Sequence, residues 1–348
     1  MSTFRGVIAF MLAFSLAPAA QAAEPIKLRL TLQLPISSHL GVNLSQFKDE
    51  VEKRTQQAVT IEIIDRSQAF KDNEVIDAVS TGKIEMGTVA LTQFAKRVPP
   101  TQFFEQPFLF TDEPLIRAAT RPGSEIRTLL DNAILQGTGI RVLWWQPYGN
   151  SVFYTRGRPV DEIARIKDMK VRTPGDIMRD FVEACGGVPT VISATKQNEA
   201  LKDGTVDAAM TSIAGVEPRE LWKVTDTVTR TEHADFEFVV MINEAVWQTL
   251  SEAHKAIFKE AALKVEKDLR ENMPAIEAKN YEFARSKNMT IVTLTQNQFA
   301  EWRACSAKVF EEFMKSNAET AVRMMTAYAK LRTDPCCNQQ PAGTFHRH

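Results

Sequence analysis

The sequence of 348 residues lacks the motifs of the common enzyme classes. It contains no G-x-S-x-G nucleophile elbow, no H-E-x-x-H zinc motif and no G-x-x-x-x-G-K-[ST] phosphate loop. Gly137-Thr138-Gly139 begins a G-x-G, but it precedes a predicted strand and lacks the third glycine of a dinucleotide site. The absence of these motifs argues against an enzyme, and we expect no cofactor.

An excess of charge of one sign is also absent. The chain has 42 Lys and Arg residues against 43 Asp and Glu residues, which gives a net charge of −1. No basic cluster interrupts this balance. Because nucleic acid binding requires a basic face, we expect no nucleic acid partner.

Long apolar runs are missing except at the start of the chain. There a single positive charge, Arg5, precedes an apolar run from Val7 to Leu16 and small residues that end in Ala20-Gln21-Ala22. This order predicts a secretory signal peptide, residues 1–23, cleaved after Ala22 or Ala23. A membrane span would need roughly 20 apolar residues. We therefore expect a protein exported to the periplasm that does not insert in the membrane after cleavage.

Cysteine and histidine are scarce. The spacing of the four cysteines and five histidines fits no zinc site, so we expect no metal. In an oxidising compartment, Cys305 could pair with Cys336 or Cys337. Cys185 is interpreted as a small buried residue on a helix face. His39, beside a predicted helix start, could line a cleft, or it could be packed or solvated.

Strands and helices alternate along the chain. Three strands, Lys27–Leu32, Val59–Ile64 and Ile84–Ala90, enclose a helix capped by Ser37 or Ser38 and a helix over Asp72–Thr81. This order is typical of a parallel α/β sheet. A second group of predicted elements comprises strands Ser151–Thr155, Met169–Arg172, Val188–Ile192, Phe236–Ile242 and Met289–Leu294, and helices Asp176–Ala184, Thr195–Lys202, Gln298–Met314 and Ala318–Leu331.

A weak internal repeat suggests two lobes of similar build. Ala78–Glu85 matches Ala200–Asp207, and each segment is a helix closed by glycine followed by an apolar strand. A long helix is expected from Ser251 to about Ser286, and Pro274 predicts either a kink near Met273 or two abutting helices.

The segment MKVRTPGD, Met169 to Asp176, places an arginine at the end of a strand. In open α/β sheets, ligands bind beyond the carboxyl ends of strands. A guanidinium there could bind a carboxylate in bidentate geometry. From this argument alone, a surface salt bridge is the default interpretation of Arg172.

The chain resembles the periplasmic solute-binding proteins of tripartite ATP-independent periplasmic (TRAP) transporters, which include C4-dicarboxylate receptors. The resemblance runs from about Lys27 to Leu331. The stretches that carry it are FKDEVEKRTQQAVTIEI, AVSTGKIEMG, QPFLFTDE, RGRPVDEIARIKDMKVRTPG, EALKDGTVDA, His233 and INEAVW.

This resemblance implies a two-lobed α/β periplasmic binding protein (Venus-flytrap) with crossing strands and a long helix that spans both lobes. We predict a first lobe of residues 24–149 and 236–276, a second lobe of residues 150–235 and 277–331, and a loosely ordered tail of residues 332–348. The implied function is to receive a small organic acid and deliver it to the membrane subunits of a TRAP transporter. By resemblance the receptor would be a monomer. The rival interpretations are a receptor that feeds a sensor protein and a periplasmic enzyme.

In this family, the arginine of the K-[VIL]-R-x-P segment binds the ligand carboxylate, and here it is Arg172. At four other positions the sequence departs from many relatives. Ser151 or Val152 replaces a second arginine, Thr211 replaces an asparagine, Ala194 replaces an aromatic residue, and Gln93 replaces the arginine of sialic acid receptors.

We expect from these departures a pocket that has lost charge and polarity. Its ligand would be a monocarboxylate with a neutral or apolar body. Because Trp144, Trp145 and Tyr148 could stack on a ring, that body could be aromatic. The two tryptophans could also pack on opposite faces of a strand, where at most one could reach a cleft. The predicted ligand-binding residues are Arg172, Gln93, Tyr148, Asn150, Ser151, Thr211, Trp145 and His39.

Overall fold

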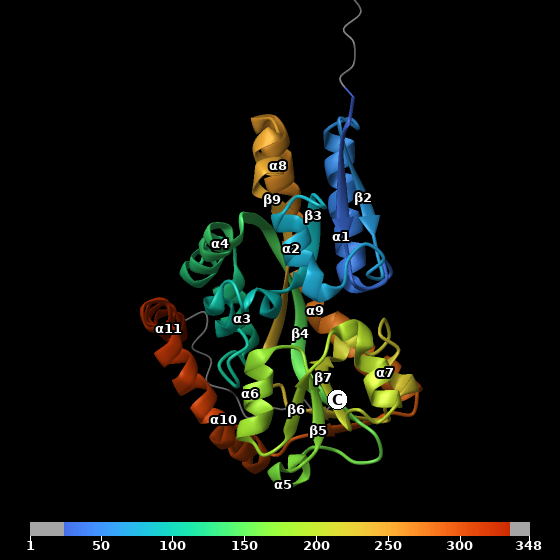
Figure 1. Ribbon diagram of the computed structural model, residues 1–348, viewed down its shortest axis with the longest axis vertical. Helices are drawn as coiled ribbons and strands as arrows, with labels where there is room; N and C mark the ends of the chain where they lie inside the picture. Colours follow the sequence, from blue (N-terminus) through green and yellow to red (C-terminus); the bar gives the residue numbers. More distant parts are fainter. Residues whose placement is uncertain (1–23, 335–348) are drawn as a thin grey trace, which may run out of the picture.

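The computed structural model describes residues 24–334. The predicted signal peptide and the cysteines Cys336 and Cys337 lie outside the described residues. Two layered α/β lobes, one above the other in Figure 1, share a continuous sheet. The predicted lobe boundaries stay a prediction.

The first lobe is built on four strands that carry its hydrophobic residues inward. Their order is β2-β1-β3-β9, followed by β4, and only β9 runs antiparallel to β3. These strands are β1 (Ile26–Thr31), β2 (Val59–Ile64), β3 (Met86–Ala90) and β9 (Asp235–Asn243). The helices of this part are α1 (His39–Arg54), α2 (Val75–Ser80), α3 (Glu113–Thr120), α4 (Glu125–Thr138) and α8 (Glu244–Thr249).

The second lobe repeats this architecture on a smaller scale. Its strands are β5 (Lys170–Thr173), β6 (Val188–Val191), β7 (Ala208–Ser212), β8 (Thr227–Arg230) and β10 (Thr290–Thr293). Within it β5 lies between β7 and β6 in parallel register, while β8 pairs with β10 and β4. Its helices are α5 (Ile163–Ile166), α6 (Asp176–Ala184) and α7 (Gln197–Lys202).

The strand β4 (Ile140–Thr155) connects the two lobes (Figure 1). Residues 140–150 pair with β9 and residues 151–155 pair with β7, both antiparallel. Trp144 and Trp145 lie on this strand, and each is fully buried in a different hydrophobic cluster. Because successive side chains alternate across a strand, the two rings pack on opposite faces. The structure thus agrees with the interpretation of the tryptophans as core residues.

The helix α9 (Glu252–Ser286) spans both lobes as one continuous helix. It contacts α1 in the first lobe and the 3-10 turn Ile213–Gly215 in the second. The alternative of two abutting helices is therefore wrong, while the kink near Met273 stays a prediction. Two further helices, α10 (Gln296–Ser316) and α11 (Ala318–Thr333), complete the chain, and α11 packs against α3 and α4.

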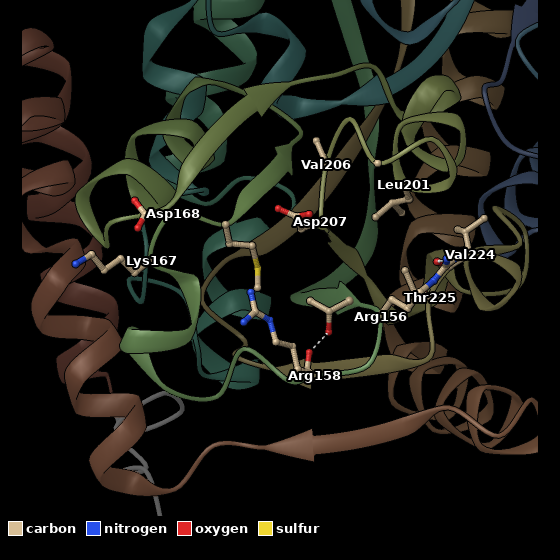
Figure 2. Close-up of a pocket in the computed structure, with 12 residues that line it drawn as sticks. Arg156, Arg158, Lys167, Asp168, Leu201, Val206, Asp207, Val224 and Thr225 are labelled. Carbon is tan, nitrogen blue, oxygen red and sulfur yellow. Dashed lines mark hydrogen bonds between the residues drawn. The ribbon is translucent and has the colours of Figure 1, made fainter.

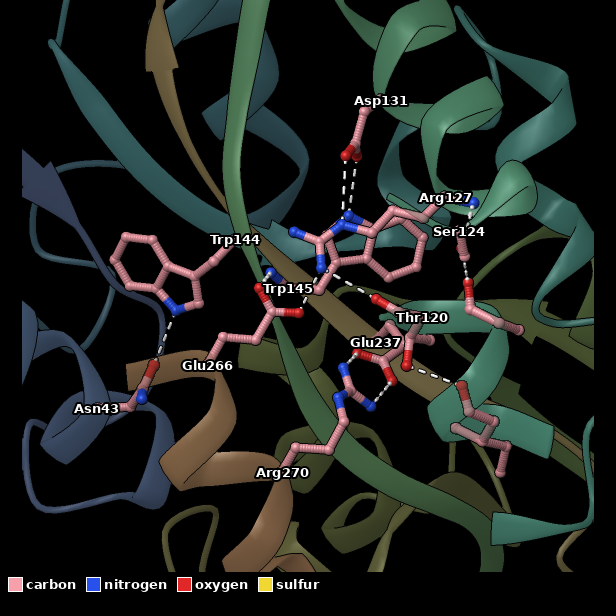
Figure 3. A network of polar contacts seen from close by, with 12 residues as sticks. Asn43, Thr120, Ser124, Arg127, Asp131, Trp144, Trp145, Glu237, Glu266 and Arg270 are labelled. Carbon is pink, nitrogen blue, oxygen red and sulfur yellow. Dashed lines mark hydrogen bonds and ion pairs between the residues drawn. The ribbon is translucent and has the colours of Figure 1, made fainter. Parts of the chain in front are cut away.

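A network of buried ion pairs attaches α9 to the crossing strands (Figure 3). Arg270 on α9 forms two hydrogen bonds of 2.8 and 3.1 Å with the carboxylate of Glu237 on β9. Glu266 on α9 pairs with Arg127 of α4, and Trp145 donates to Asp131 at 2.9 Å. Buried charges are tolerated when they are paired and hydrogen-bonded, so these contacts hold α4, α9 and both crossing strands together.

Cys185 and Cys305 form a disulfide between the end of α6 and α10. Their Cα atoms lie 5.2 Å apart, within the range that a disulfide requires. This pairing corrects the predicted bridge from Cys305 to the tail. Cys185 is buried, as interpreted, but its bond to Cys305 was not predicted from the sequence. The two cysteines are 120 positions apart, and no sequence pattern indicated that α6 and α10 pack together.

Candidate functional site

Arg172 lies on β5, the strand that ends at Thr173, and only 3% of its surface is exposed. Its Nε donates to the carbonyl of Ile192 and its Nη1 to the carbonyl of Met210, each at 2.8 Å. Among residues 24–334, no carboxylate forms an ion pair with it and no group hydrogen-bonds to Nη2. The guanidinium is therefore oriented by neutral backbone groups and keeps unused donors.

Burial, followed by the positive charge of Arg219, lowers the pKa of Arg172 to about 9. Asp72 and Tyr148 act in the opposite direction and raise it. The side chain remains cationic at neutral pH. A buried cation without an ionic partner is costly, and an anionic ligand would supply the missing partner.

Arg172 lines a cavity of about 50 Å³. The crossing strands, the first lobe and the second lobe all contribute residues to its wall. Tyr148, Phe236 and Phe238 come from the crossing strands β4 and β9. The first lobe contributes Gln33, Asp72, Ala90, Thr92 and Gln93, and the second contributes Arg172, Pro174, Ala194, Thr211 and Arg219. Of the predicted site residues, the structure brings together Arg172, Gln93, Tyr148 and Thr211 at this cavity.

The cavity contains a second cation that the sequence reasoning missed. Arg219 follows the 3-10 turn Ile213–Gly215 at the end of β7, and its Nε donates to the hydroxyl of Tyr148 at 3.2 Å. The expectation of a pocket that had lost charge did not include this cation, and the expected loss of polarity stays a prediction. Because β7 lies beside β5 in parallel, residues that follow its carboxyl end approach the same site, and the sequence alone did not reveal this pairing.

Contacts between the lobes close one side of the cavity. The carboxylate of Asp72 in the first lobe accepts hydrogen bonds from the hydroxyl of Ser193 and, at 3.1 Å, from the backbone N–H of Ala194. Gln93 donates to the carbonyl of Pro174 at 3.5 Å. A Cβ on Gly175 would lie 2.2 Å from the hydroxyl oxygen of Thr92, so the lobes approach closely only because this residue is glycine.

The other predicted residues do not line this cavity. Trp145 is fully buried between Phe104 and Asp131. Ser151 is fully buried opposite Ser212 in the pairing of β4 with β7. Asn150 donates its backbone N–H to Glu277 at 3.4 Å. Strand pairing, which a sequence does not reveal, decided these positions.

His39 lies behind the cavity wall. Its ring stacks on that of Tyr148, with centroids 5.4 Å apart. Burial lowers the pKa of His39 to about 4, against a smaller opposite effect of a hydrogen bond with the backbone of Pro147. Its ring is therefore neutral at physiological pH and supports Tyr148 without adding charge to the site.

A larger hollow of about 420 Å³ lies in the second lobe (Figure 2). Arg158, Lys167 and Asp207 are among its lining residues, and Asp207 accepts the backbone N–H of Lys170 at 2.9 Å. None of its lining residues belongs to the first lobe or to the long helix. It cannot be enclosed by movement of one lobe against the other, so the smaller cavity between the lobes is the stronger candidate.

In the described part of the chain, no three His, Cys, Asp or Glu side chains are placed to hold a metal ion. Over the same residues, none of the helices combines the length and the apolar character that crossing a membrane requires.

A family model described as "Bacterial extracellular solute-binding protein, family 7" matches residues 33–317. A solute-binding protein of Verminephrobacter eiseniae is 27% identical over 309 residues, which cover 88% of this chain and 90% of that protein. Two solved structures are similar, each with a TM-score of 0.81. One is a TRAP periplasmic solute-binding protein from a Polaromonas species bound to D-erythronate, 26% identical, covering 87% of this chain and 98% of the other. The second is DctP7 of Bordetella pertussis, an extracytoplasmic solute receptor that binds pyroglutamic acid, 22% identical, covering 87% and 99%.

Proposed function

The chain belongs to the bacterial extracellular solute-binding protein family 7, and from this premise we propose that it receives a small organic acid between its lobes in the periplasm. It would then deliver the acid, as a monomer, to the membrane subunits of a TRAP transporter. The ligand carboxylate would bind to Arg172.

One observation carries the assignment of Arg172. The guanidinium is buried in a cavity between the lobes, and no carboxylate among residues 24–334 forms an ion pair with it. A carboxylate in the cavity could use the donors on Nη1 and Nη2 that the backbone carbonyls leave free, and charge-assisted bonds of this kind are strong.

The charges around the cavity favour a ligand with one negative charge. Arg172 and Arg219 are cationic and Asp72 is anionic, so a monocarboxylate would make the site neutral. A dicarboxylate would leave an excess negative charge in a buried site. The small cavity volume, about 50 Å³, favours a compact body over an aromatic one.

The ligands of similar receptors support this choice. D-erythronate and pyroglutamic acid, bound by the Polaromonas and Bordetella proteins, are small monocarboxylic acids that carry further oxygen atoms. Closure of the lobes would exclude water and strengthen the ion pair with Arg172.

Calorimetric titration of the purified protein and of Arg172→Ala with a panel of small organic acids tests the proposal. We expect the substitution to cost on the order of 2–5 kcal/mol, or about 30-fold or more in affinity, since the ligand carboxylate would remain buried without its partner. Arg158→Ala is the matched control because Arg158 lines only the hollow of Figure 2. An Arg172→Ala protein that is folded by circular dichroism and binds its acid normally would refute the assignment.

A further inference from the structure

We infer that Arg219 and Tyr148 form a second subsite that binds an oxygen atom on the body of the ligand. The receptor would then select monocarboxylates that carry a hydroxyl, oxo or lactam oxygen over plain aliphatic acids of the same size. This inference rests on the proposed function, because it assumes that a carboxylate occupies Arg172.

Arg219 is held in place from several sides. Its backbone N–H donates to the carbonyl of Gly215 at 3.1 Å, and its own carbonyl accepts from the side chain of Asn198 at 2.5 Å. The guanidinium carbon lies 6.0 Å from the ring centroid of Tyr148, in addition to the hydrogen bond between Nε and the Tyr148 hydroxyl. The side chain is thus directed to the cavity wall before any ligand arrives.

Tyr148 is equally well fixed. Its ring lies between His39 and Phe238, whose centroids are 5.4 and 4.9 Å away. A Cβ on Gly215 would come within 3.0 Å of the Tyr148 hydroxyl oxygen, so the hydroxyl lies directly over this glycine. Tyr148 is only 2% exposed, and its ring position varies little without repacking of both aromatic neighbours.

Both side chains have hydrogen-bond donors to offer. The Tyr148 hydroxyl accepts from Arg219 and keeps its own proton for an acceptor. Arg219 uses Nε on this contact, and within residues 24–334 no hydrogen bond or ion pair engages its Nη1 or Nη2. An arginine carries five N–H donors, so those on Nη1 and Nη2 remain available to an oxygen atom of a ligand.

Asp72 does not compete for these donors. Its two carboxylate oxygens accept from Ser193 and Ala194, and within residues 24–334 no hydrogen bond or ion pair joins Asp72 to Arg219. Arg219 also borders a groove of about 740 Å³ on the far side of Tyr148, which His39 and Glu217 line as well. Arg219 therefore contributes to both surfaces, whereas Tyr148 lines only the cavity.

The physical basis of selection is the cost of an unpaired donor. A plain aliphatic acid would bury the Tyr148 hydroxyl without an acceptor for its proton, which costs about 1–3 kcal/mol, and would offer no acceptor to Arg219. Sites built to hydrogen-bond an oxygen reject analogues that lack it far more strongly than apolar pockets reject a missing methylene.

Two matched pairs of acids test the inference by calorimetry on the full chain. Pyroglutamate is compared with cyclopentanecarboxylate, which has the same ring size, and D-erythronate with butyrate, which has the same carbon number. Wild-type protein should bind the oxygen-bearing member of at least one pair about 10-fold or more tightly. In Arg219→Met this preference should fall to within about 3-fold, with little change for the plain acid. Tyr148→Phe, which keeps the ring, should weaken the preference in the same direction.

The outcomes separate this inference from the proposed function. If Arg172→Ala abolishes binding but Arg219→Met keeps the full preference, the function stands and the inference is overturned. Equal weakening of both members of a pair in a folded Arg219→Met would also overturn it, because the residue would then act only on the carboxylate or on the fold. Binding of no acid by the wild-type protein would overturn both.

Discussion

Buried arginines in this protein are of two kinds, and the contrast identifies the site. Arg127 and Arg270 are 5% and 8% exposed, and each is paired with a buried glutamate, Glu266 and Glu237 respectively. Arg172 is 3% exposed and donates only to backbone carbonyls. The first two arginines are satisfied within the described chain and serve the structure. Arg172 has no ion-pair partner among residues 24–334, so its positive charge is available to an anionic ligand.

Glu277 is a buried acid near the crossing strands. It lies beside Gly149, where the pairing of β4 with β9 shifts register. The φ angle of Gly149 is +92°. A Cβ at Gly149 would lie 2.3 Å from a carboxylate oxygen of Glu277, so only glycine permits this approach. Burial and then the charge of Glu232 raise the pKa of Glu277 to about 7, Glu113 adds to the rise, and Asn150 and Arg230 oppose it.

This pKa predicts a stability that depends on pH. Between about pH 4.5 and 7, the folded protein binds a proton at Glu277 that the unfolded chain has released. The free energy of unfolding therefore falls as the pH rises through this window. Glu277→Gln keeps the neutral shape and should become progressively more stable than wild type as the pH rises. Urea unfolding at several pH values measures this difference. Glu282→Gln, an exposed glutamate of the same helix, is the control, and a Glu277→Gln difference that does not change with pH would contradict the prediction.

At the scale of elements, α9 shows how a proline is accommodated inside a long helix. Pro274 has no N–H, so the carbonyl of Arg270, four residues earlier, loses its usual partner. Arg117 of α3 donates to this carbonyl at 2.8 Å. The helix therefore remains continuous, and the proline position becomes an attachment point for α3.

The disulfide between α6 and α10 is the second connection at this scale. Cys185 is 5% exposed and follows α6, whose helix begins just after the Arg172 strand. The bond closes a loop of 120 residues, and loops of that length gain stability when closed because the unfolded chain loses conformational freedom.

The double substitution Cys185→Ser and Cys305→Ser should lower the free energy of unfolding by about 2–4 kcal/mol under oxidising conditions. Dithiothreitol should destabilise the wild-type protein by a similar amount and leave the variant unchanged, which provides an internal control. Urea unfolding with and without reductant measures both effects. Peptide mapping under non-reducing conditions that joined Cys305 to the tail instead of Cys185 would refute the pairing.

At the scale of the whole molecule, the lobes meet across the cavity through a small number of polar contacts. Asp72 accepts hydrogen bonds from Ser193 and Ala194 of the second lobe, and Gln93 donates one to the carbonyl of Pro174. Contacts that cross between two lobes stabilise the closed arrangement only, so each of them adds to the apparent affinity for a ligand that requires closure.

Ser193→Ala tests this role without changing the charge of the site. Loss of one hydrogen bond between the lobes should weaken acid binding by about 3- to 10-fold and favour the open arrangement. Small-angle scattering of the ligand-free protein should show a larger radius of gyration, and saturating acid should restore the wild-type value. Ser316→Ala, at the exposed end of α10, should change neither quantity. Unchanged affinity and radius in Ser193→Ala would show that the hydrogen bond from Ser193 to Asp72 does not hold the lobes together in solution.

Much of the architecture could be predicted from the sequence because it depends on local periodicity. The strand Val59–Ile64 and the helix Asp176–Ala184 have the predicted limits, and Ser38 and Ser251 cap the helices that follow them. The resemblance to TRAP receptors is confirmed by the family match. Arg172 was identifiable because its motif and its position at the end of a strand are both local features.

What only the tertiary structure decided are pairings between distant segments. Cys185 forms a disulfide with Cys305 because α6 packs on α10. Trp145 lies in the core and not in the cleft because β4 pairs with β9 along residues 140–150. Arg219 enters the cavity because β7 lies beside β5. Local patterns determine which elements form, since they depend on neighbouring residues. The charge and shape of the cavity depend on side chains from segments that only folding brings together, and these the sequence by itself could not place.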